Sequence, residues 1–273
     1  MKKIIYIALC LIGFSGCDNW LDVSASDQIK ESQLFENGNG FRSALLGIYQ
    51  NLSTEDLYGK NMTWGFMDCL GQLYDPKAIT LNGGELVQAQ NYAFEHSAVK
   101  PVITKIWESM YNCIANCNNV ITNIEHASPS IFEYKEEEKN MILGEALALR
   151  GFMHFDLLRL FAPAPKAGAS GTYIPYCTSY PEIRSPKLSV DDFLKLVIED
   201  LEKAQDLTAK FDTLPDNIKA IQDAFYRVGK ANYFQERGIF WSYRGTRMNY
   251  MNVTALLARV YMYSGQIDKA YEE

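Results

Sequence analysis

The stretch ALLARVYMYSGQIDKA, residues 255–270, decides the fold class of this chain. A helical pattern of apolar residues runs through its first half, and Gly265 then supplies the residue type that most readily makes a turn. Ala258 and Ala270 are small enough for two antiparallel helices to approach each other, and Tyr261 is spaced to pack across them. The stretch therefore predicts two helices joined at Gly265.

This spacing resembles that of a tetratricopeptide helix pair, and an ordinary helical hairpin is the alternative interpretation. No strict tandem period is found elsewhere in the chain, so other repeats are expected to be diverged or interrupted. Only a short stub follows Gly265, too short to complete a second helix. We therefore expect the apolar residues of the first helix to be partly exposed, namely Leu256, Leu257, Val260 and Tyr261.

Helical periodicity also predicts the rest of the fold as all-α, with long irregular loops rich in aromatic residues. The expected helices are 41–52, 103–124, 137–161, 189–207 and, more weakly, 216–227. The helix at 137–161 is apolar around most of its circumference and should lie centrally. Ser189 is expected to cap its helix, with acidic residues in the first turn.

Three other segments are interpreted from local composition. The charge run at 136–139 is typical of a solvated helix start. Residues 162–188 hold five of the nine prolines and are expected to form a surface connection without regular structure. Residues 53–95, with scattered glycines and aromatics, are expected to form a long structured loop region, and ordered loops of that length usually have a function.

Composition excludes several classes of function. The chain has 273 residues, 48% of them hydrophobic, which excludes disorder as its main state. Its net charge of −7 repels phosphate backbones, so nucleic acid is not an expected partner. Aromatic residues make up 13% of the chain, whereas only three residues are histidines. Few residues are therefore available for histidine-based catalysis.

The N-terminus predicts export and lipid attachment. Two lysines, an apolar run at 4–14 and small residues follow in the order of a signal peptide, and the run is too short to span a bilayer. Phe14-Ser15-Gly16-Cys17 resembles the lipobox of bacterial lipoproteins, although Leu is usual in place of Phe14. We therefore expect a signal peptide over 1–16 and a mature domain over 17–273, anchored by acyl chains on Cys17. An ordinary secretory signal is the alternative.

The remaining cysteines do not indicate a metal site. Cys113 and Cys117 lie four apart on a helical pattern, where a disulfide between them would be strained. Together with Cys69 and Cys177 they lack the paired spacing or nearby histidines of a zinc site. Buried free thiols are expected, with one long-range bridge left open, and no metal or cofactor is expected.

Six strings, taken in order, resemble the SusD/RagB family of glycan-binding outer-membrane lipoproteins. They are CDNWLD at 17–22, ALLGIYQNL at 44–52, WESMYNCIANCNNVITNI at 107–124, GEALALRGFMHFDLLRLFAPAP at 144–165, the stretch 189–204, and RMN at 247–249 running into ALLARVYMYSGQ. The resemblance implies a non-catalytic protein at the cell surface that binds oligosaccharide or another nutrient. It also implies a TonB-dependent, SusC-like transporter as the partner that receives the ligand. Family members are longer, so the chain is expected to correspond to their N-terminal part.

The aromatic segment 53–95 carries the candidate glycan site. Neutral sugars need flat apolar faces together with amide or carboxylate partners for their hydroxyl groups. The candidates are Trp64, Tyr74, Asn91, Tyr92 and Phe94, and a purely structural role for each stays open. Trp107 is expected to pack in the core, while Trp241 and Tyr243 form a lesser candidate cluster.

No catalytic set is apparent. His154 has no nucleophile near it in sequence and is expected to be a hydrogen-bonded structural residue rather than a general base. Two alternatives to glycan capture stay open: a lipid-anchored glycoside hydrolase, which needs two carboxylates across a cleft, and a helical scaffold that binds only protein.

Overall fold

The computed structural model describes residues 31–79, 84–168, 170–181, 184–222 and 238–273. The elements, in order, are α2 (Glu31–Leu34), α3 (Gly38–Leu52), α4 (Phe66–Leu70), α5 (Pro76–Ile79), α6 (Gly84–Gln90), α7 (Lys100–His126), η2 (Pro129–Ile131), α8 (Lys135–Phe161), η3 (Pro165–Ala167), β1 (Ile174–Pro175), β2 (Lys187–Leu188), α9 (Val190–Asp212), α10 (Pro215–Gln222), α11 (Ile239–Ser242), η6 (Arg244–Thr246), α12 (Tyr250–Ser264) and α13 (Ile267–Glu272). The all-α prediction is confirmed apart from one two-strand ladder. The compact unit described below begins at Phe35, so α2 lies outside it.

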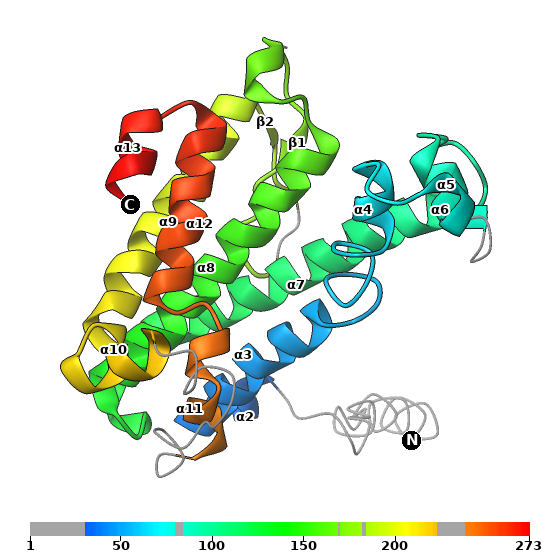
Figure 1. Cartoon of the computed structure of the whole chain (residues 1–273). Helices are drawn as coiled ribbons and strands as arrows, with labels where there is room; N and C mark the ends of the chain where they lie inside the picture. Colours follow the sequence, from blue (N-terminus) through cyan, green and yellow to red (C-terminus); the bar gives the residue numbers. More distant parts are fainter. Residues whose placement is uncertain (1–30, 80–83, 169, 182–183, 223–237) are drawn as a thin grey trace, which may run out of the picture. The chain divides into compact units, whose positions relative to one another are not determined.

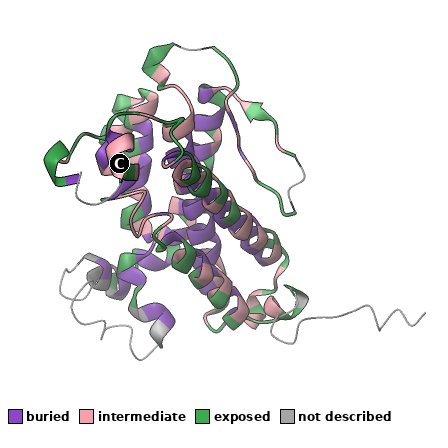
Figure 2. Cartoon of the chain, turned by 90° about the vertical axis from the view of Figure 1, so that its right-hand side faces the viewer, coloured by how far each residue is buried: buried purple, intermediate pink, exposed green. Residues whose placement is uncertain are grey.

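Helix α8 is the centre of this unit (Figure 1). It packs against α7 and α9 over much of its length, and α3 and α12 also contact it. Most of its residues are buried, as the purple ribbon of the central helices shows (Figure 2). An apolar pattern around nearly the whole circumference predicts such a position, because every side of the helix then gains by burial.

Glycines bring α8 and α9 unusually close together. A Cβ atom placed on Gly144 would lie 2.8 Å from Cγ2 of Thr208, and one on Gly151 would lie 3.1 Å from Cδ2 of Leu201. Any larger side chain at Gly144 would push the two helices apart. The small residues of α8 thus set the distance between the two main helices of the core.

The turn at Gly265 has the predicted form, but the exposure expected beside it is wrong. Gly265 has a φ of 84°, the left-handed conformation that glycine adopts at a helix end, and a short helix α13 does follow it. The four apolar residues of α12 expected to be partly exposed are all buried, each at 7% exposure or less. Helix α9 covers them, because α12 packs along it. Tyr261 adds a hydrogen bond across this contact, donated to Glu202 at 2.5 Å.

Two expectations based on local composition need correction. The segment 53–95 contains three short helices, α4 to α6, rather than only loop. The connection 162–188 contains a ladder in which Ile174 pairs with Leu188. The three helices and the ladder are all too short to show a sequence period. Their stability therefore depends on contacts with the rest of the unit.

The charge run at the start of α8 is not fully solvated. Glu138 is completely buried and accepts hydrogen bonds from Nε of Arg42, at 2.6 Å, and from the backbone N–H of Tyr134, at 3.1 Å. Arg42 comes from α3, far away in sequence, so the neighbouring acids give no sign of this partner. At the start of α9 the predicted cap by Ser189 is confirmed, since its Oγ accepts the backbone N–H of Asp192 at 3.2 Å.

The cysteines on α4 and α7 are buried thiols. Cys69, Cys113 and Cys117 form no disulfide and lie in the core, as predicted, while Cys177 is half-buried. Burial raises the pKa of the Cys113 thiol to about 11. Burial also raises the pKa of Cys69 and Cys117, so these three core thiols stay protonated and unreactive near neutral pH.

A buried ionic network joins α7, α8 and α9. Arg150 on α8 donates to both carboxylate oxygens of Asp200 on α9, at 2.7 and 2.6 Å, and to Oδ1 of Asn118 on α7, at 2.9 Å. Tyr176 donates its hydroxyl to the same carboxylate at 2.5 Å. Asn118 and His154 continue the network to the backbone of residues 177–179. Three helices and the strand segment are thereby held by one set of polar side chains.

A second buried network joins α3, α8 and α9 to the segment before α12. Arg244 pairs with Glu145 at 2.9 Å and with both oxygens of Asp212, the nearer at 2.5 Å. Tyr49 donates its hydroxyl to Glu145 at 2.7 Å and accepts the backbone N–H of Met248 at 2.8 Å. Every charge in this set therefore has a partner of opposite sign inside the core.

Candidate functional site

The candidate aromatic residues lie on the segment that carries α4, α5 and α6. Three of them expose large parts of their rings: Trp64 is 58% exposed, Tyr92 52% and Phe94 45%. The polar ends of two rings are already bonded, since Trp64 donates Nε1–H to the Gly59 carbonyl at 3.0 Å and Tyr92 donates its hydroxyl to the Leu70 carbonyl at 3.0 Å. The rings are thereby fixed in position, with apolar surface left facing solvent.

The five candidates come together as two groups. Tyr74 donates its hydroxyl to the backbone carbonyl of Trp64, which ties the first pair. Tyr92 and Phe94 form the second pair, with ring centroids 6.2 Å apart, and the exposed Asn91 precedes them in the turn after α6. Gln90 holds this turn beside the first pair, because its side chain donates to the Tyr74 carbonyl at 2.8 Å.

The backbone of Tyr92 is held in an uncommon conformation. Its φ is 55°, in the left-handed region that bulky residues rarely adopt. Such a conformation costs free energy and persists only where the surrounding contacts impose it. At Tyr92 those contacts are the hydroxyl bond to Leu70 and the ring contact with Phe94, so the local fold presents this ring at the surface.

A cleft of about 440 Å³ adjoins Phe94. Its walls are mostly apolar, and its lining includes Phe66 and Phe161. The rim carries an ion pair between Glu95 and Lys100 at 2.6 Å, both of which also line the cleft. An apolar floor with a few polar groups at the rim suits a small ligand such as a sugar ring. The cleft joins α4, α7 and the end of α8, so no local pattern in the sequence predicts it.

The two other tryptophans in the described part of the chain are not surface platforms. Trp107 is half-buried and packs against Tyr111 and Phe161, with centroid distances of 4.7 and 4.8 Å, as expected for a core position. Trp241 is fully buried and meets the Tyr134 ring edge-on at 4.9 Å, so its assignment as a lesser glycan candidate is wrong. Tyr243, its neighbour in that assignment, is 58% exposed.

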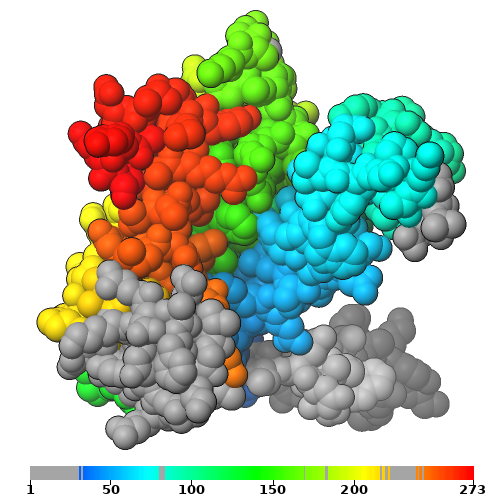
Figure 3. Space-filling model, viewed as in Figure 1, coloured from blue at the N-terminus to red at the C-terminus, as the bar shows by residue number. Residues whose placement is uncertain are grey.

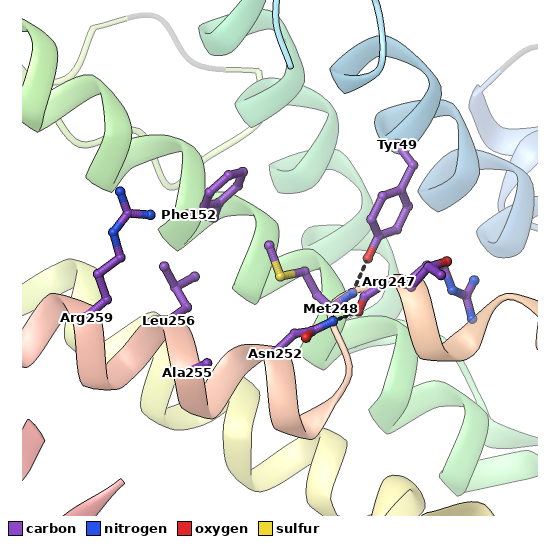
Figure 4. Close-up of a pocket in the computed structure, with 9 residues that line it drawn as sticks. Tyr49, Phe152, Arg247, Met248, Asn252, Ala255, Leu256 and Arg259 are labelled. Atoms are coloured by element: carbon purple, nitrogen blue, oxygen red, sulfur yellow. Dashed lines mark hydrogen bonds between the residues drawn. The ribbon is translucent and has the colours of Figure 1, made fainter. Parts of the chain in front are cut away.

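Two further clefts lie where α8 meets α12, and the sequence reasoning missed both. The first has a volume of about 350 Å³, and its lining includes Phe152, Leu256 and Met248 (Figure 4). The second, of about 600 Å³, is lined by Tyr58, Asp156, Arg159 and Tyr263 among others. Phe152 and Arg259 line both clefts, which therefore adjoin.

His154 is structural, as predicted. It is fully buried, its Nδ1 lies 3.0 Å from the Arg150 carbonyl, and its Nε2 accepts the backbone N–H of Cys177 at 3.1 Å. These partners assign the proton to Nδ1. Burial, with the nearby Arg150 charge, lowers the pKa of His154 well below its usual value. A neutral ring with both nitrogens occupied has no site left for proton transfer to a substrate.

Neither a metal site nor a membrane-spanning helix is found in the described part of the chain. Within it, no three side chains from His, Cys, Asp and Glu are grouped to hold a metal ion. Of the helices that the structure describes, none is both long enough and apolar enough to cross a membrane.

Comparison with known proteins gives one consistent family. The SusD-like family described as "Starch-binding associating with outer membrane" matches residues 19–226. SusD-like protein P25 of Formosa agariphila is 23% identical over 208 residues, which cover 74% of this chain and 37% of that protein.

Solved structures show the same fold. A putative sugar-binding protein of Bacteroides vulgatus superposes with a TM-score of 0.57 at 22% identity, over 85% of this chain and 44% of that one. A SusD-like carbohydrate-binding protein of the same organism gives 0.57 at 21%, over 86% and 43%. The chain thus spans less than half the length of these relatives. Because the family match covers most of its residues, the chain belongs to the SusD-like family.

Proposed function

We propose that this protein binds oligosaccharide, or another nutrient, at the outer-membrane surface without catalysing a reaction. The observation that carries the proposal is the set of exposed aromatic rings on the α4–α6 segment, with Trp64 and Tyr92 fixed by hydrogen bonds through their polar ends. Such rings offer their faces to the C–H surface of a sugar and lose little conformational freedom on binding. The family description names starch, and one relative is named as a carbohydrate-binding protein, which supports the same ligand class.

The ligand site would comprise both groups of candidates. Trp64 and Tyr74 would provide one aromatic pair, Tyr92 and Phe94 the other, and the Asn91 amide would bond sugar hydroxyls. The cleft beside Phe94 extends the second pair with further apolar surface and with the charged rim of Glu95 and Lys100. Separate contact points of this kind suit a ligand with several linked rings.

We further propose that the protein is attached to the outer membrane and hands its ligand to a TonB-dependent, SusC-like transporter. Residues 1–16 would be the signal peptide and residues 17–273 the mature SusD-like domain, anchored through lipid on Cys17. The signal peptide and Cys17 lie outside the described ranges. This proposal therefore depends on the lipobox resemblance of the sequence. The family's association with the outer membrane supports it.

The test is calorimetric titration with a panel of neutral oligosaccharides. Trp64→Ala and Tyr92→Ala should each weaken binding by about 1 to 3 kcal/mol, roughly 5- to 150-fold in Kd, the scale of losing a large stacked aromatic contact. Tyr271→Ala is the control, because it removes an exposed aromatic ring from α13, outside the candidate segment. Binding that survives both changes would place the site elsewhere.

The same samples separate the alternatives. A glycoside hydrolase would release new reducing ends from one of the oligosaccharides, whereas a binding protein leaves them intact. A scaffold that binds only protein would show no heat of binding with any sugar. Both outcomes would contradict the proposal.

A further inference from the structure

The two clefts between α8 and α12 form one groove. Figure 3 shows the green surface of α8 between the orange of α12 and the blue to cyan of α3 and α4. Phe152 and Arg259 belong to both clefts and mark their junction. The groove is thus longer than either cleft alone, and it is built from elements other than the α4–α6 aromatic rings.

Aromatic rings form much of the groove wall. Tyr58 and Phe152 lie with ring centroids 4.9 Å apart at an angle of 30°. Tyr263, on α12, meets the buried Phe155 edge-on at 5.3 Å and lines the second cleft. Tyr58 donates its hydroxyl to Asp156 at 2.9 Å, and burial together with this carboxylate raises the pKa of Tyr58 well above its usual value. Its ring therefore stays neutral.

The groove carries one positive charge that has no ion-pair partner among the described residues. Arg159 is paired with Asp156 at 2.9 Å, so these two charges cancel. Arg259 is exposed, and no carboxylate of the described residues forms an ion pair with it. The guanidinium carbons of both arginines lie 5.6 Å from the centre of the Phe155 ring, so both side chains contact this buried ring. One cationic group is left over, on a protein whose net charge is −7.

Arg247 does not add to this charge. Its guanidinium points away from Phe152 and Arg259 (Figure 4). It lies over the Phe240 ring at 4.1 Å and within 3.5 Å of the Glu145 carboxylate. Its charge is thus directed into the core, which leaves Arg259 as the cation that faces a groove ligand.

We propose that this groove binds oligosaccharides that carry a carboxylate or sulfate group, with the anion on Arg259 and a sugar ring against Phe152. A guanidinium offers two parallel N–H donors that match the oxygens of either group. The nearby aromatic faces supply the apolar contact that a sugar ring needs. This inference rests on the proposed function and adds the class of substrate, an acidic glycan.

The test compares ligands that differ only in charge. Oligogalacturonate and its methyl ester provide the carboxylate arm, and a chondroitin sulfate oligosaccharide before and after desulfation provides the sulfate arm. The purified protein should bind the charged member of at least one pair about tenfold or more tightly, the scale of a hydrogen bond between charged groups. This preference should weaken as salt is added, because the arginine is exposed.

Three variants assign the preference to the groove. Arg259→Met keeps most of the apolar stem and should remove the preference for charge, so that the charged and uncharged members of a pair bind alike. Arg259→Lys keeps the charge but loses the paired donors, so it should retain only part of the preference. Lys195→Met removes the same charge from an exposed position on α9 and should leave the preference intact.

Failure here is distinguishable from failure of the proposed function. If uncharged sugars bind as tightly as charged ones, or if the preference for charge survives Arg259→Met, the groove inference is overturned. Neither result contradicts the proposed aromatic site. If the gain is lost in Arg259→Met while Trp64→Ala and Tyr92→Ala have no effect, the groove stands and the aromatic site falls. If no oligosaccharide binds, both are overturned.

Discussion

Replacing Asp200 by Asn tests whether the buried network around Arg150 organises the core. The Asp200 carboxylate is 8% exposed and accepts three hydrogen bonds, two from Arg150 and one from Tyr176. Asparagine has the same shape but no charge, and one of its two acceptor oxygens becomes a donor. The Arg150 guanidinium would then remain in the core without its counter-charge.

The expected cost is large. Removing one partner of a buried ion pair typically costs about 3 to 5 kcal/mol, because the other charge is left without compensation. A domain has a net stability of only about 5 to 15 kcal/mol, so Asp200→Asn should remove a substantial part of it. Glu125→Gln is the control, since it breaks a surface pair with Lys203 whose side chains are 46% and 53% exposed. That change should cost less than about 1 kcal/mol.

Urea unfolding followed by circular dichroism measures both variants. The midpoint of Asp200→Asn should fall well below that of the wild type, with the slope preserved, while Glu125→Gln should overlay the wild type. An Asp200→Asn curve within about 1 kcal/mol of the control would refute the reasoning, because it would show that the core tolerates the Arg150 charge alone.

Three other changes test separate features of the molecule. Gly144→Ala should cost about 1 to 3 kcal/mol of stability, because its Cβ would overlap Thr208. Gly47→Ala is the control and should cost nothing, because the space around Gly47 is open. Equal melting temperatures for the two variants would contradict this. His154 has a folded-state pKa below its unfolded value of about 6.5, so its contribution to the free energy of unfolding is fully present above pH 6.5. As the pH falls below that value, the contribution should decline by up to about 1.4 kcal/mol per pH unit. If His154→Asn leaves the pH dependence of stability unchanged, this reasoning is wrong. Cys17→Ala should move the protein from the membrane fraction to the soluble fraction, and unaltered fractionation with no acyl mass at the N-terminus would reject the lipid anchor.

The long helices could be predicted from sequence because their signals are local. The period of apolar residues, the Ser189 cap and the Gly265 turn each depend on residues within a few positions of one another. The central place of α8 follows from the same pattern, since a helix with no polar side gains by being covered on all sides.

Several of the errors and omissions involve partners distant in sequence. Glu138 looks solvated beside its acidic neighbours until Arg42 arrives from α3, and Trp241 looks like an exposed aromatic until Tyr134 covers it. The groove at Phe152 and Arg259 exists only where α8 and α12 meet. The sequence identified the segment of the candidate rings, but the hydrogen bonds that fix Trp64 depend on how the chain folds back there.

The polar side chains of α7 and α8 hold the segment 175–179 by its backbone. Tyr111 donates to the carbonyl of residue 175 at 2.9 Å, Asn118 donates to those of residues 177 and 179, and His154 accepts the N–H of residue 177. All of these bonds are made to backbone atoms of the segment, so they do not depend on which side chains the segment carries. The outward-facing positions of this segment can therefore change sequence without loosening its attachment, which lets the protein acquire new surface chemistry there while its helices stay as they are.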